Sequence, residues 1–91
     1  MLEKIKERCG IAQSVTVYDN DILAYIEDCR ADMIASGVSK KLAKSEKNAG
    51  VLTAVTLYVK AYLGDDRTDT EKYLKLYWNK VFRLSLEEGG T

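Results

Sequence analysis

The chain contains no histidine and no proline, and it has only two cysteines among its 91 residues. Without histidine it lacks the commonest general base, the usual partner of a serine or cysteine nucleophile, and the commonest ligand of transition metals. Cys9 and Cys29 alone cannot complete a tetrahedral zinc site, which needs four ligands. The residue pattern therefore predicts no catalytic site, no cofactor site and no metal site.

An excess of charge of one sign is also missing, because 14 basic and 14 acidic residues give a formal net charge of zero. Domains whose main work is to grip phosphates usually carry a basic surplus. No apolar run approaches the roughly 18 residues needed to cross a bilayer. The opening residues, MLEKIKERCG, lack the apolar centre of a secretory signal. We therefore expect no membrane partner, and two free thiols in a reducing compartment.

What remains is the composition of one small globular domain over residues 1–91, with 46% hydrophobic and 31% charged residues. A chain of this length buries roughly two thirds of the surface that its unfolded form exposes. Its own core is therefore modest, and association with another chain would help to stabilise it.

Apolar residues at helical spacing predict an all-α fold, a small bundle of about four helices. The glycines lie near the ends of these patterns, as expected for helix termini. Residues 11–18 are predicted to form a loop, and Asp19 or Asn20 to cap the second helix. The last two helices should form an antiparallel hairpin, because the connection between them is short. The four helices are expected over residues 2–9, 19–36, 49–63 and 70–86, the last capped by Thr68, Asp69 or Thr70.

The third predicted helix, VLTAVTLYVKAYL, is apolar almost all the way round. Its polar positions, Thr53, Thr56 and Lys60, form one narrow stripe. Such a helix is normally buried on most sides, and a small monomer can rarely surround one of its own helices. We therefore expect another chain to cover part of it.

The last helix presents a broad apolar arc that is expected to face the core, while two leucines, Leu76 and Leu86, project onto its charged side. These two leucines are either isolated exposed side chains or contacts with a partner chain. Tyr58 and Tyr62 can stack along their own helix or meet the last helix across the hairpin. Tyrosine and tryptophan suit both a core and an interface. The arc consists of Tyr73, Leu74, Tyr77, Trp78, Val81 and Phe82.

Two charged segments are candidates for contacts with other molecules. Asp21, Asp28 and Asp32 form an acidic ridge on the second helix, either solvated or paired with the basic segment 38–50 of a neighbouring chain. Their spacing spreads them along the helix and does not bring them together around one metal ion. The segment 38–50, with Lys40, Lys41 and Lys44, is predicted to be a helical turn around Leu42 or a loop. It either is solvated or contacts DNA or another chain.

Taken in order, these features resemble the head–tail connector (adaptor) proteins of tailed bacteriophages and prophages. The similarity runs from about Lys4 to Leu86 and lies in the order and spacing of four segments. Two features depart from the family pattern: Asn48-Ala49-Gly50 stands where a proline is common, and the segment 38–50 is unusually basic. The four segments are RCGI (8–11), DNDILAYIEDCRADMI (19–34), VLTAVTLYVKAYL (51–63) and TEKYLKLYWNKVFRLSLEEG (70–89).

The resemblance implies a structural role in the virion, in a ring of about twelve protomers docked beneath the portal. The ring would extend the DNA channel without sequence-specific binding and carry the downstream connector or stopper protein, after assembly in the host cytoplasm. A flexible tail, residues 87–91, would reach the portal. The alternatives are a small DNA-binding regulator that uses segment 38–50 and a cytosolic protein-interaction adaptor. The expected interface residues are Asp21, Asp28, Asp32, Lys40, Lys41, Lys44, Tyr58, Tyr62, Leu76, Leu86, Glu87 and Glu88.

Overall fold

The computed structural model describes residues 1–63 and 67–87 of the chain. Within them every regular element is a helix, in the order α1 (Leu2–Arg8), α2 (Asp19–Ala35), α3 (Lys40–Ala43), α4 (Ala49–Leu63) and α5 (Arg67–Glu87). The all-α prediction is therefore confirmed, with the one-turn helix α3 added to the four predicted helices. Glu87 is the last residue of α5, and the remainder of the predicted tail, 88–91, lies outside the described residues.

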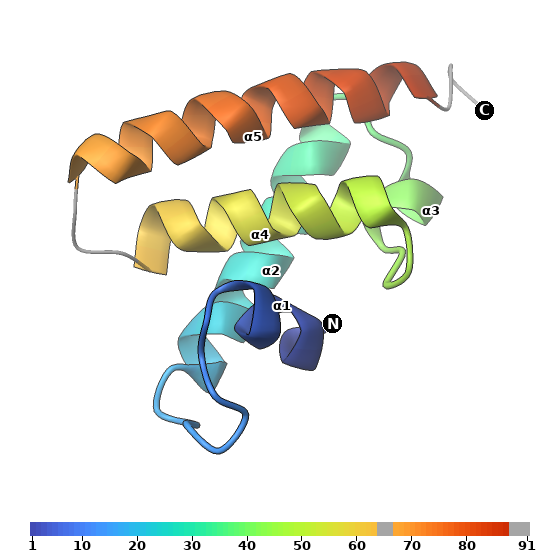
Figure 1. The fold of residues 1–91 in the computed structure, drawn as a ribbon. Helices are drawn as coiled ribbons and strands as arrows, with labels where there is room; N and C mark the ends of the chain where they lie inside the picture. The colour runs from blue at the N-terminus through green and yellow to red at the C-terminus, as the bar shows by residue number, and fades with distance from the viewer. Residues whose placement is uncertain (64–66, 88–91) are drawn as a thin grey trace.

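The C-terminal hairpin of α4 and α5 is the most extensive helix pairing in the molecule. Figure 1 shows the two helices lying side by side along one edge, while α2 crosses them steeply and α1 lies beside the other end of α2. The hairpin was predicted from the short connection. The core lies where α2 meets α4 and α5, and its largest fully buried side chains include Tyr77, Ile5, Ile22, Met33 and Leu84.

The environment of α4 differs from the sequence-based expectation. This helix contacts α1, α2 and α5, so its own chain surrounds it on most sides. Thr56 is buried and donates a hydrogen bond of 2.7 Å from its hydroxyl to the carbonyl of Leu52. Lys60 lies over the ring of Tyr73, 5.9 Å from its centroid. Its own chain therefore covers most of the helix, and the prediction that another chain covers part of it stays untested. Tyr62 is the one strongly exposed large side chain of α4 among the described residues.

Both predicted caps are wrong. Tyr18 occupies the N-cap of α2 without a side-chain hydrogen bond, and Asp19 is the first helical residue. Asp19 instead forms an ion pair with Lys6, in which its Oδ1 lies 2.9 Å from the ammonium nitrogen, and the Lys6 side chain is only 2% exposed. Lys6 also donates to the carbonyl of Gln13 at 3.0 Å. The pair thus joins α1, the loop 11–18 and the start of α2. For α5, the structured helix already begins at Arg67, so Thr68, Asp69 and Thr70 lie inside it.

Other helix ends use residues that are typical of helix termini. Gly37 has φ = +101° after α2, a left-handed conformation that favours glycine. Ser39 caps α3 by accepting a hydrogen bond of 3.1 Å from the amide of Leu42. The side-chain oxygen of Asn48 accepts one of 3.0 Å from the amide of Val51 at the start of α4. Asn48 therefore supplies a polar cap at the start of α4.

Candidate protein–protein interface

One member of the predicted acidic ridge is engaged inside the chain. Tyr77 of α5 is fully buried, and its hydroxyl donates a hydrogen bond of 2.7 Å to Oδ2 of Asp32 on α2. The thiol of Cys29 lies 3.7 Å from the same hydroxyl, and burial raises the pKa of this thiol to about 12. Burial likewise raises the pKa of Tyr77 far above its ordinary value. Asp32 therefore contributes to helix packing, and its predicted contact with another chain remains untested.

The other two carboxylates of the ridge are free for contacts. Asp21 and Asp28 are exposed, and neither forms an ion pair within 1–63 and 67–87. They alternate along α2 with three exposed alanines, at spacings of three and four residues that place all five on one helix face. We call this surface the α2 outer face, and it consists of Asp21, Ala24, Asp28, Ala31 and Ala35.

The predicted basic residues lie on and just after α3. Lys40, Lys41 and Lys44 are all exposed, whereas Leu42 and Ala43 of the same turn are buried. No ion pair joins these lysines to the acidic ridge in the described part of the chain. This basic surface therefore presents charge without an exposed large apolar residue of α3.

The aromatic residues predicted as interface residues divide into two groups. Tyr58 is half-buried, and its ring lies 5.1 Å from that of Tyr77 across the hairpin and 4.8 Å from that of Tyr62. Burial raises the pKa of Tyr58 to about 12. Tyr62 is 46% exposed and stacks on Tyr25 of α2 at 5.9 Å. Both predicted arrangements of the tyrosines, along the helix and across the hairpin, therefore occur.

On α5, Leu76 and Leu86 are exposed, as their position on the charged side of the helix predicts. Glu87 is exposed as well, whereas Glu88 lies outside the described residues. The predicted arc is wrong in two members, because Trp78 and Phe82 are 58% and 65% exposed. Leu84, which the arc left out, is fully buried. Helix α5 packs mainly on α4 along one side, so the residues at the margin of a broad apolar arc remain exposed.

Sequence reasoning predicted the exposure of Leu86 but missed that Trp78 and Phe82 are exposed beside it. Trp78, Phe82 and Leu86 follow one another at intervals of four residues and form a stripe along α5. We call these three residues the α5 stripe. The width of the apolar arc could have indicated that part of it is exposed. A helix that packs against its neighbours on one side buries only part of so wide an apolar surface.

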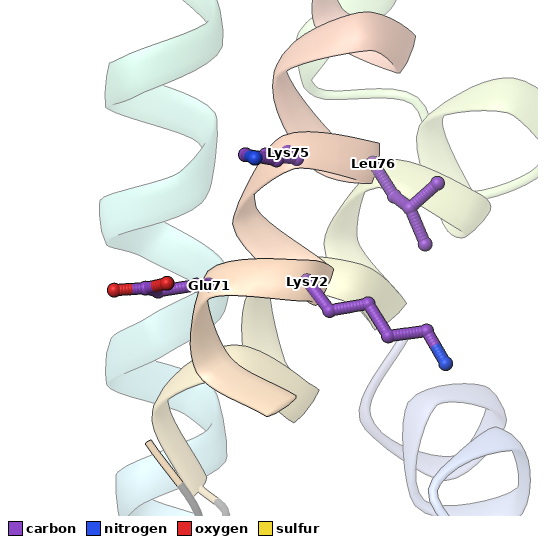
Figure 2. A pocket seen from close by; sticks show the side chains of 4 residues that line it. All are labelled: Glu71, Lys72, Lys75 and Leu76. Carbon is purple, nitrogen blue, oxygen red and sulfur yellow. The ribbon is translucent and has the colours of Figure 1, made fainter. Parts of the chain in front are cut away.

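A shallow hollow on α5 does not form a ligand site. Its lining residues are Glu71, Lys72, Lys75 and Leu76, all from one helix. Figure 2 shows that Glu71 and Lys75 point to one side of the helix while Lys72 and Leu76 point to the other, so their side chains do not converge. Among the described residues, no three potential metal ligands cluster, and no helix is long and apolar enough to cross a membrane.

Comparison with known proteins identifies the family. A family model described as "Phage connector protein" matches residues 1–91. No curated protein and no solved structure matches the chain significantly. The match extends over the whole length, and the helices lie where the resemblance of the sequence to connectors places them. The chain therefore belongs to the phage connector proteins, structural components of the virion.

Proposed function

We propose that this protein forms a ring of about twelve protomers beneath the portal of a tailed phage and joins the capsid to the tail. The observation that carries the proposal is the family match over residues 1–91. It is supported by a folded domain that leaves Trp78, Phe82 and Leu86 exposed, since large exposed apolar groups mark sites of protein association.

In this role the ring extends the channel through which DNA passes and carries the downstream connector or stopper protein. A formal net charge of zero suits a channel wall along which DNA slides without being held. We further propose that assembly takes place in the host cytoplasm. We assign the exposed residues of the predicted interface to contacts with neighbouring copies, the portal or the stopper. They are Asp21, Asp28, the exposed lysines of α3, Tyr62, Leu76, Leu86 and Glu87.

The alternative of a DNA-binding regulator receives no comparable support. The basic segment folds as the four-residue helix α3, and two of its residues are buried. Recognition helices read base edges with several exposed side chains in the major groove, which a single half-buried turn does not offer. If α3 did bind DNA, the affinity would fall steeply with salt and would disappear in the triple variant Lys40→Ala, Lys41→Ala, Lys44→Ala.

The proposed function is tested by co-expressing the tagged full chain with the portal protein of the same phage. We expect the portal to co-purify and electron microscopy to show the chain as a ring on one end of it. A chain that neither binds the portal nor associates with itself would contradict the proposal. The stopper protein, added to the purified complex, should bind only when the connector is present.

A further inference from the structure

The α5 stripe has no partner within the described part of the chain. Trp78, Phe82 and Leu86 are 58%, 65% and 63% exposed, although α5 is packed on α4 along its other side. Tryptophan is among the residues most enriched in the energetic centres of protein interfaces. Resting on the proposed function, we propose that the α5 stripe binds the α2 outer face of a second copy of this chain, and that this contact closes the ring.

The charge around the stripe identifies its partner. Between residues 72 and 83, α5 carries Lys72, Lys75, Lys80 and Arg83 and no acidic residue. None of these four cations forms an ion pair with any residue of 1–63 or 67–87. Glu71 precedes this stretch and Glu87 follows it, so the surface around Trp78 and Phe82 is positively charged while the two ends of the stripe carry a carboxylate each. The positively charged centre favours an acidic partner, since like charges facing each other across an interface are costly.

The α2 outer face offers the complementary charge. Helix α2 contains five acidic residues and one basic residue, Arg30. Asp19 is paired with Lys6, Arg30 with Glu27, and Asp32 accepts the hydrogen bond of Tyr77. Asp21 and Asp28 remain exposed without such partners. These two carboxylates are thus available to the cations that flank the stripe of a neighbouring copy.

The two surfaces also match in side-chain size. Ala24, Ala31 and Ala35 are exposed and carry only a methyl group each, so a second helix can approach α2 closely along this face. The indole of Trp78 and the ring of Phe82 project from α5 and would fill the space above the alanines. Large side chains on one helix against small ones on the other give the close packing found in the centres of interfaces.

The lysines of α3 are the competing partner for the acidic face. They are exposed, but their neighbours Leu42 and Ala43 are buried, so this surface adds charge without apolar area. Surface ion pairs alone contribute little to association. The α5 surface combines cations with three large apolar side chains, and it is therefore the stronger partner for α2.

The proposed contact joins two different surfaces of identical chains. Such a heterologous contact repeats from copy to copy and closes into a ring when the rotation permits. Within one copy, the fold leaves both surfaces exposed, so the contact forms only between copies. This property allows the two surfaces to be disabled separately and then tested together.

The experiment uses two variants of the full chain. The α5 variant carries Trp78→Glu and Phe82→Glu, and the α2 variant carries Asp28→Arg and Ala31→Arg. All four positions are exposed, so circular dichroism and the thermal midpoint should match those of the wild-type chain. Neither variant should form the ring alone or on the portal. An equimolar mixture should form a dimer, because the intact α5 of one variant meets the intact α2 of the other.

Two control variants make the result specific. Leu23→Glu also places a charge at an exposed position of α2, but on a different side from the alanines, and should assemble as the wild type does. The triple variant Lys40→Ala, Lys41→Ala, Lys44→Ala should assemble as well. If this triple variant failed while the α5 variant assembled, the acidic face would bind α3 and the inference would be overturned.

Failure of the inference is distinguishable from failure of the proposed function. A wild-type chain that assembles on the portal, together with an α5 variant that assembles equally well, overturns the inference and leaves the function intact. A folded mixture of the two variants that contains only monomers also overturns it. A wild-type chain that neither associates with itself nor binds the portal overturns both.

Discussion

The hydroxyl of Tyr77 donates a hydrogen bond of 2.7 Å to Oδ2 of Asp32 and joins α5 to α2 at a fully buried position. Replacing Tyr77 with phenylalanine removes the hydroxyl, so the partly buried carboxylate of Asp32 loses this hydrogen bond. We expect Tyr77→Phe to lower the free energy of unfolding by about 1–2 kcal/mol, measured by urea denaturation. The matched control is Tyr73→Phe, because the hydroxyl of Tyr73 makes no hydrogen bond within the described residues. An equal loss of stability in Tyr73→Phe would contradict a stabilising hydrogen bond between Tyr77 and Asp32.

The ion pair of Lys6 with Asp19 predicts a second stability effect. The Lys6 side chain is 2% exposed and the Asp19 side chain 25% exposed, so Lys6→Met leaves a largely desolvated carboxylate unpaired. We expect a loss of about 2 kcal/mol, less than for a fully buried pair because Asp19 retains some contact with water. Lys4→Met removes an exposed partner of Glu7 and should cost less than about 0.5 kcal/mol.

Alkaline pH should destabilise the fold. Burial raises the pKa of Cys29 from 9.0 to about 12 and that of Tyr58 from 10.0 to about 12. Because the folded protein holds these protons more tightly than the unfolded chain, their contribution is complete below pH about 9 and declines as the pH rises towards about 12. Urea midpoints measured across this window should fall, and Cys29→Ala should reduce the slope. A urea midpoint that does not change with pH in this window would contradict the raised pKa values of Cys29 and Tyr58 in the folded protein.

Gly37 ends α2 with φ = +101°, a conformation that side chains disfavour. A Cβ at this position would lie 3.7 Å from Cβ of Ser85, an ordinary contact, so the cost of Gly37→Ala is conformational. We expect a loss of about 1–2 kcal/mol in the free energy of unfolding. Ser36→Ala, at the neighbouring exposed position, should change it by less than about 0.5 kcal/mol. Equal effects of the two substitutions would argue against the backbone explanation.

Leu76 tests the predicted interface away from the α5 stripe. It is 45% exposed on the charged side of α5, so Leu76→Asp should leave the thermal midpoint nearly unchanged. We expect it to weaken assembly, because it places a charge where a partner chain is proposed to pack. Light scattering of the purified variant and its retention on the portal measure the effect. Normal assembly of Leu76→Asp would show that Leu76 is simply an exposed leucine.

Local sequence patterns predicted the helices well but not how their surfaces are covered. The bounds of α4 follow from its apolar run, whereas burial of Leu84 and exposure of Trp78 depend on where α2 and α4 cross α5. Lys6 was not predicted to be buried, because a lysine is stable in a core only when a distant partner such as Asp19 meets it. Of the α5 stripe, the sequence predicted only Leu86 to be exposed, because Trp78 and Phe82 belong to the apolar arc and only the packing shows that they lie outside.

The molar mass of the purified wild-type chain tests the central claim, that this protein acts by forming a ring. Light scattering over a range of concentrations gives the number of copies, and negative-stain imaging gives the shape of any large species. The account predicts closed rings of about twelve copies, formed either by the chain alone or upon addition of the portal. A chain of 10.2 kDa that remains monomeric both alone and with the portal would contradict it.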